Sequence, residues 1–96
     1  MIFEVSYLYR DASNYKQYAS VVVDVTGAKN IEGVEERMRR RFAALQVWPD
    51  VVHFRPEDLG WPTAYFEDHD EGGEDIGLHE IEAIAETGKP VTAILP

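Results

Sequence analysis

The sequence predicts an α+β fold, with a small, mainly antiparallel sheet and one main helix packed on one face of that sheet. Two observations predict it. Near the N-terminus, apolar and polar residues alternate in two segments, which is the period of half-buried strands. The next segment changes to the period of an amphipathic helix. A chain of 96 residues with these elements is expected to form one compact α+β domain over residues 1–96.

The two predicted strands are residues 1–9 and 18–25. In the first, Phe3, Val5 and Tyr7 fall on one face. The second is rich in valine, whose β-branched side chain favours strands. The polar segment between them is too short for a helix that crosses a sheet. We therefore expect an antiparallel hairpin with a long loop.

The predicted helix covers residues 30–46, where apolar side chains recur every three or four positions and Asn30 stands at the N-cap. Glutamates come early in this segment and arginines late, which complements the helix dipole and allows ion pairs between residues four apart. Packed on the hairpin, this helix predicts one core, formed by Phe3, Val5, Val21, Val23, Val34, Met38 and Phe42.

The second half of the chain gives weaker structural signals. Residues 51–54 form a short apolar run typical of a brief strand, and residues 56–60 read as one helical turn with Pro first and Gly last. Residues 76–86 fit both a helix face and a loose alternation. The turn residues that follow favour a strand paired with a last strand at 91–95.

Charge is divided unevenly along the chain. Residues 1–50 are neutral overall, whereas residues 51–96 carry eleven acidic residues against two basic ones, which accounts for the whole net charge of −9. Such a field repels nucleic acid and attracts basic surfaces or cations. Dispersed charge would serve solubility equally well, so we expect the clustered acids to meet a basic protein surface.

The expected interaction surface combines the densest acidic stretch with the aromatic residues before it. Its members are Trp61, Tyr65, Phe66, Glu67, Asp68, Asp70, Glu71, Glu74 and Asp75. A second candidate surface is the hairpin loop, where polar residues stand between tyrosines, because such loops often carry binding residues. Its members are Arg10, Asp11, Asn14, Tyr15 and Lys16.

Several chemistries find no support in the sequence. The chain has no cysteine, which excludes thiolate nucleophiles and cysteine-based metal sites. A calcium-type loop starting at Asp68 would have Gly72 in place of an oxygen ligand and His79 in place of the final glutamate. No nucleophile motif or phosphate-binding loop is present. We therefore expect no catalytic residues, no metal ligands and no cofactor.

The leading hypothesis is a non-enzymatic interaction protein that docks on a basic surface, as an inhibitor, an immunity-type protein or a mimic of nucleic acid. The alternative is a domain that binds a small molecule or a divalent metal, with Trp48, Trp61 and Tyr65 lining a pocket, and a small enzyme comes third. No direct contact with nucleic acid is expected. No apolar run approaches the ~18 residues of a membrane span, and the first residues lack the pattern of a signal peptide. A cytoplasmic location is expected.

Overall fold

The computed structural model describes residues 1–10, 15–46, 50–64 and 78–95. Within these ranges the chain forms four β-strands, one α-helix and two short 3-10 helices. In chain order the elements are β1 (Ile2–Arg10), β2 (Lys16–Asp24), α1 (Ile31–Arg41), η1 (Ala43–Leu45), β3 (His53–Phe54), η2 (Pro56–Leu59) and β4 (His79–Glu86).

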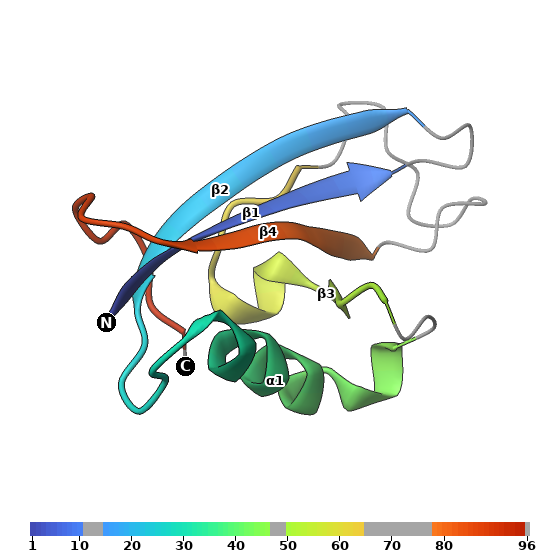
Figure 1. Cartoon of the computed structure of the whole chain (residues 1–96). Helices are drawn as coiled ribbons and strands as arrows, with labels where there is room; N and C mark the ends of the chain where they lie inside the picture. The colour runs from blue at the N-terminus through green and yellow to red at the C-terminus, as the bar shows by residue number, and fades with distance from the viewer. Residues whose placement is uncertain (11–14, 47–49, 65–77, 96) are drawn as a thin grey trace.

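The four strands form one sheet in the order β2-β1-β4-β3, and each neighbouring pair is antiparallel. Figure 1 shows that the sheet is curled and that α1 and the segment around η2 lie on the same side of it. The predicted α+β fold, with an antiparallel sheet and one helix on one face, is confirmed. We call the side of the sheet that faces α1 the inner face.

The predicted hairpin forms between β1 and β2, with Phe3 opposite Val23 and Val5 opposite Val21. Because side chains alternate along a strand, this register places all four residues on the inner face. Across the sheet, Ile84 of β4 is the other neighbour of Val5. The alternation of apolar and polar residues near the N-terminus therefore arises, as predicted, from strands that have one buried face.

Helix α1 begins as predicted, because Asn30 Oδ1 accepts a hydrogen bond of 2.9 Å from the backbone N–H of Gly33. The pairs Glu35–Arg39 and Glu36–Arg40 also form, at 3.2 and 2.8 Å. The helix ends at Arg41, earlier than expected, and η1 follows it.

The core lies between the inner face of the sheet and the elements that cover it. All seven predicted core residues belong to this one cluster of buried side chains, which also includes aromatic residues from β1, β3 and the segment after η2. The buried members are Phe3, Val5, Tyr7, Val21, Val23, Val25, Ala28, Val34, Met38, Phe42, Val52, Phe54, Leu59 and Trp61.

Two predictions for the C-terminal half need correction. The strand predicted at 51–54 is reduced to His53–Phe54. The prediction of a last strand at 91–95 paired with 76–86 is wrong, since β4 instead lies between β1 and β3. The 91–95 segment makes a single parallel bridge, between Ala93 and Val23, along the outer edge of β2. Pro90, which has no N–H to donate, precedes it.

Candidate functional site

Most of the predicted acidic interaction surface lies outside the described residues: Tyr65, Phe66, Glu67, Asp68, Asp70, Glu71, Glu74 and Asp75. Its remaining member, Trp61, is described, and only 3% of its surface is exposed. Its indole N–H donates a hydrogen bond of 2.7 Å to the carbonyl oxygen of Ile94. In this structure the ring of Trp61 therefore packs in the core and fastens the C-terminal segment.

The segment around Trp61 is attached to the inner face by two further polar contacts. The hydroxyl of Tyr7 donates to the carbonyl oxygen of Pro62, and the backbone N–H of Ala64 donates to Nε2 of His79 at 2.9 Å. Burial raises the pKa of Tyr7 to about 12, so its phenol stays neutral and serves as a donor. These aromatic and histidine side chains hold the fold together rather than lining a site.

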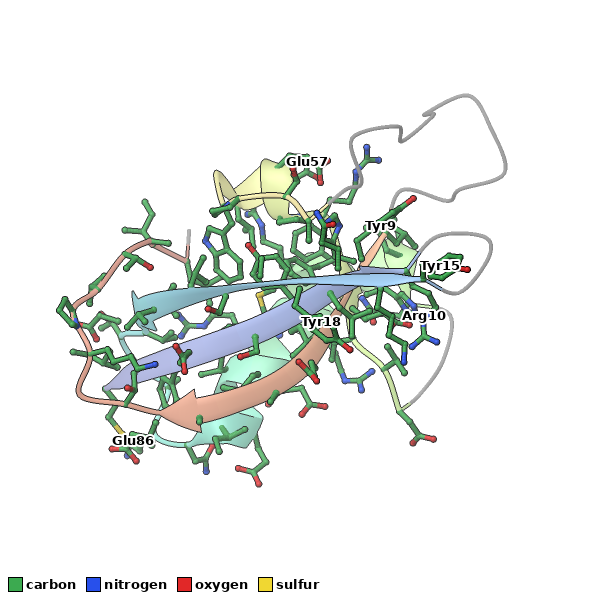
Figure 2. All side chains as sticks on the ribbon, turned by 90° about the horizontal axis from the view of Figure 1, so that it is seen from above. Tyr9, Arg10, Tyr15, Tyr18, Glu57 and Glu86 are labelled. Carbon is green, nitrogen blue, oxygen red and sulfur yellow. The ribbon has the colours of Figure 1, made fainter. Side chains whose placement is uncertain are left out.

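The second predicted surface is described in part. Arg10, Tyr15 and Lys16 are described, whereas Asp11 and Asn14 lie outside the described residues. The side chain of Tyr15 is 71% exposed, at the end of the sheet opposite Glu86 (Figure 2). Arg10 is engaged within the fold, since its guanidinium donates to a carboxylate oxygen of Glu80 at 3.1 Å.

A histidine that sequence reasoning did not select stands next to that ion pair. Nε2 of His53 lies 3.8 Å from the Glu80 carboxylate, because the pairing of β3 with β4 places the two residues opposite each other. Burial lowers the pKa of His53, and the nearby Glu80 charge opposes this shift. With 5% exposure, this imidazole is neutral at pH 7 and is closed to a substrate.

The backbone of His53 is held by a side chain in place of another strand. The amide of Gln46 donates to the His53 carbonyl oxygen at 2.7 Å and accepts from the His53 N–H at 3.1 Å. The same amide nitrogen also donates to the carbonyl oxygen of Phe42. Gln46 thus takes up the hydrogen-bonding groups of His53 at the outer edge of β3, so they are not open to a further strand.

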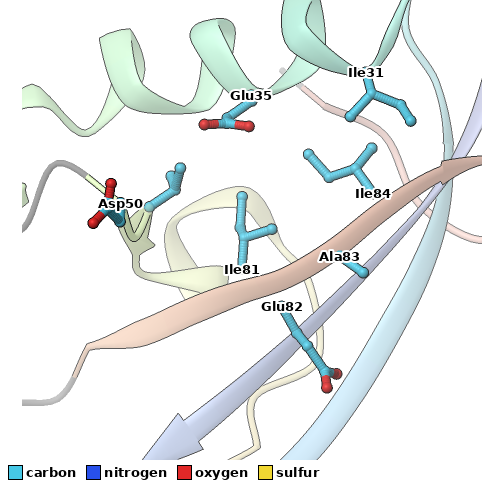
Figure 3. Close-up of a pocket in the computed structure, with 8 residues that line it drawn as sticks. Ile31, Glu35, Asp50, Ile81, Glu82, Ala83 and Ile84 are labelled. Carbon is cyan, nitrogen blue, oxygen red and sulfur yellow. The ribbon is translucent and has the colours of Figure 1, made fainter.

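The structure brings together a different set of residues in a pocket between α1 and β4, which we call the α1–β4 groove. Its volume is about 210 Å³. Figure 3 shows Ile81 and Ile84 pointing from β4 toward α1, with the Glu35 carboxylate on the helix above them. The eight lining residues are Ile31, Glu35, Asp50, Val52, Ile81, Glu82, Ala83 and Ile84.

The α1–β4 groove combines apolar and acidic groups. Isoleucine and valine side chains form part of its wall, but most of its accessible surface is polar. Glu35, Asp50 and Glu82 are its ionisable lining residues, no basic residue lines it, and Glu35 is paired with Arg39. Figure 3 shows the side chain of Glu82 directed away from the helix, so this carboxylate lies at the margin of the groove. Such a site suits a group that is both apolar and positively charged.

A β-bulge explains why the groove was not found from the sequence. Tyr7 of β1 pairs with Ile81 and Ser6 pairs with Ala83, so Glu82 is an extra residue without a partner in β1. The bulge places Ile81 and Ile84, three residues apart, on the same face. This three-residue spacing also fits a helix face, which is why residues 76–86 were compatible with a helix. It is the sequence feature from which the groove could have been inferred.

The described residues hold no arrangement typical of a metal centre. They contain no group of three or more histidine, aspartate or glutamate side chains arranged to hold an ion. The stretch after Asp68, where a cation loop was considered, lies outside the described residues. The carboxylates of the α1–β4 groove come from α1, from Asp50 and from β4, and they do not form such a group.

Within the described ranges, no helix has the length and apolar character needed to cross a membrane. Comparisons with protein-family models, with curated proteins and with solved structures gave no match for this chain.

Proposed function

We propose that this chain is a small, non-enzymatic interaction protein that docks on a basic protein surface. The observation that carries the proposal is the α1–β4 groove, in which isoleucine side chains lie beside three carboxylates and no basic residue is among the lining residues. The charge of residues 51–96, with eleven acids against two bases, supports the same conclusion.

The two components of the groove have different roles in such a complex. The acidic residues raise the rate of encounter with a basic partner through long-range attraction, an effect that falls as salt screens it within ~8–10 Å. The apolar wall supplies affinity, because its contacts form only when water is removed. A protein that covers a basic active site and one that imitates the charge of nucleic acid both use these components.

The proposal is tested by capturing the partner from source-cell lysate at low and high salt, followed by affinity measurement with the purified partner. One variant carries Asp50→Asn and Glu82→Gln at the groove. A second neutralises the six acids of the 67–75 stretch, namely Glu67, Asp68, Asp70, Glu71, Glu74 and Asp75. The control variant carries Glu57→Gln and Asp58→Asn, which remove the same number of charges as the groove variant does, but from exposed positions of η2.

We expect wild-type protein to retain a basic partner at low salt and to lose it as salt rises. At least one of the two variants should weaken the complex, and the η2 control should bind as wild type does. If neutralising both acidic sets together leaves the affinity unchanged, the acids serve solubility and the proposal is wrong.

A further inference from the structure

One edge of the sheet next to the groove has exposed backbone groups. In an antiparallel ladder the N–H and C=O of successive residues point alternately to the two sides of a strand. The N–H of Thr87 donates to the carbonyl oxygen of Ile2 in β1 at 3.0 Å. Counting back from Thr87, the backbone groups of Ala85 also face β1, whereas those of Ile84 and Glu86 face away from it.

On that outer side, β3 covers only the first part of β4. His53 and Phe54 pair with Glu80 and His79, and the N–H of Ile81 donates to the carbonyl oxygen of Val52 at 3.0 Å. Beyond this bond, no residue in the described ranges pairs with β4 on this side. The outer edge of residues 82–86 is therefore available for hydrogen bonding.

We infer that the outer edge of β4, together with the α1–β4 groove, binds an extended basic segment of the partner as an added strand. This inference rests on the proposed function and states how the partner is held. Backbone pairing with Ile84 and Glu86 supplies the hydrogen bonds, as in other cases of strand addition. Side chains that alternate along the added strand then reach the groove.

The groove fits one set of those side chains. A residue opposite Ile84 and on the same face projects toward α1, where Ile31 and Ile84 present apolar surface. The residues on either side of it project to the opposite face of the sheet, toward which the Glu82 side chain is directed, so basic side chains suit these positions. The segment expected is one in which apolar residues alternate with lysine or arginine.

Charge argues for a basic segment and against a second copy of the chain. If two copies of β4 paired along this edge, each would bring the acidic residues Glu80, Glu82 and Glu86 to the pair and no lysine or arginine. Like charges directly opposite each other destabilise a strand pair. The same acids that prevent self-association attract a basic strand, so the edge is selective.

The inference is tested with a synthetic peptide of alternating lysine and valine, added to ¹⁵N-labelled protein at low salt. We expect slower hydrogen exchange at the amides of Ile84 and Glu86 on peptide binding, while the amide of Ala85, already bonded to β1, changes little. A peptide of alternating glutamate and valine has the same strand preference with the opposite charge, and it should not bind.

A pair of variants separates backbone pairing from charge. Glu86→Pro removes an N–H that faces away from β1, so the existing sheet keeps its bonds, whereas Glu86→Gln removes the charge and keeps the N–H. Relative to Glu86→Gln, Glu86→Pro should weaken binding of the lysine–valine peptide by about tenfold. The two variants should melt at similar temperatures.

The outcomes distinguish this inference from the proposed function. If the peptide binds without protecting Ile84 and Glu86, or if the two variants bind equally, strand addition is wrong and docking through charge remains. If the peptide fails to bind while the captured partner still depends on the acids, strand addition is again wrong. The proposed function itself is overturned if the peptide fails to bind and the captured partner does not depend on the acidic residues.

Discussion

At the end of the sheet where β1 begins, the two sheet edges differ in how their backbone groups are hydrogen-bonded. At the β2 edge, the N–H of Val22 donates to Thr92 Oγ1 at 2.9 Å, and its carbonyl oxygen accepts from the N–H groups of Thr92 and Ala93. At the β4 edge, Ile84 and Glu86 have no such cover within the described ranges. The chain thus uses its own C-terminal segment to satisfy one edge and places acids along the other.

This contrast indicates what each edge is for. A satisfied edge adds stability and prevents unwanted pairing, whereas an open edge costs stability unless something occupies it. The acidic residues along β4 are expected to oppose pairing of the open edge with itself. The following predictions test the contrast, beginning with the core on which both edges depend.

Val23→Asp should unfold the domain and remove both edges. Val23 is fully buried opposite Phe3, and an unpaired buried carboxylate costs several kcal/mol, comparable with the whole stability of a small domain. Circular dichroism should show loss of the folded spectrum. Ser20→Asp, at an exposed position of the same strand, should melt within a few degrees of wild type. A folded Val23→Asp with normal melting would contradict the core described above.

Thr92→Val should weaken the closed edge by about 1–2 kcal/mol, because the N–H of Val22 loses its side-chain acceptor. Urea denaturation measures this change, with Val91→Ala as a control at an exposed neighbouring position. Equal stability of the two variants would mean that the 91–95 segment does not secure the β2 edge.

The β3 end of β4 should respond to pH through His53. Because burial lowers the pKa of this imidazole in the folded state, the unfolded chain binds the proton more readily. Stability from His53 is thus fully present above the unfolded pKa of about 6.5 and is lost as the pH falls below it. Glu80→Gln removes the charge that opposes the shift.

An NMR titration of the His53 ring should therefore give a still lower pKa in Glu80→Gln than in wild type. Glu82→Gln, which neutralises an exposed residue of the same strand, is the control and should leave the titration nearly unchanged. A rise of the His53 pKa in Glu80→Gln would show that Glu80 does not act on the imidazole.

The smallest effect is expected from Glu86→Lys, which should let the open edge pair with itself. In a dimer formed by two β4 strands, Lys at this position would bring an opposite charge to a pair that otherwise has only acidic residues, and each opposite-charge cross-strand pair contributes roughly 0.2–1 kcal/mol. Sedimentation at high protein concentration should detect weak dimers of Glu86→Lys and monomers of Glu86→Gln. Dimers of wild-type protein through this edge would contradict the inference drawn for β4.

The sequence was sufficient wherever structure depends on local periodicity. The hairpin, the start of α1 at Asn30 and the core around Val23 follow from alternation, helical spacing and capping. The position of the 91–95 segment was not predictable, because its hydrogen bonds are made to Val22, about seventy residues earlier in the chain.

The candidate site was less predictable for the same reason. The α1–β4 groove joins Glu35, Asp50 and Ile84 from three separate segments, and no local motif connects them. The contact of His53 with Glu80 also arises from strand pairing and not from spacing in the sequence. The predicted acidic surface remains a prediction, since all of its members except Trp61 lie outside the described residues.

The bulge at Glu82 has a consequence for changes in chain length. A single deletion within a regular strand turns every residue on one side of it to the opposite face. In β4, deletion of Glu82 would instead restore unbroken alternation, with Ile81 and Ile84 still on the inner face. The shorter strand would keep its contribution to the core and lose the bend and extra twist that the bulge gives it. The extra residue is therefore expected to be dispensable for folding, and its deletion should change the shape of the edge above the groove and remove one of the groove's carboxylates.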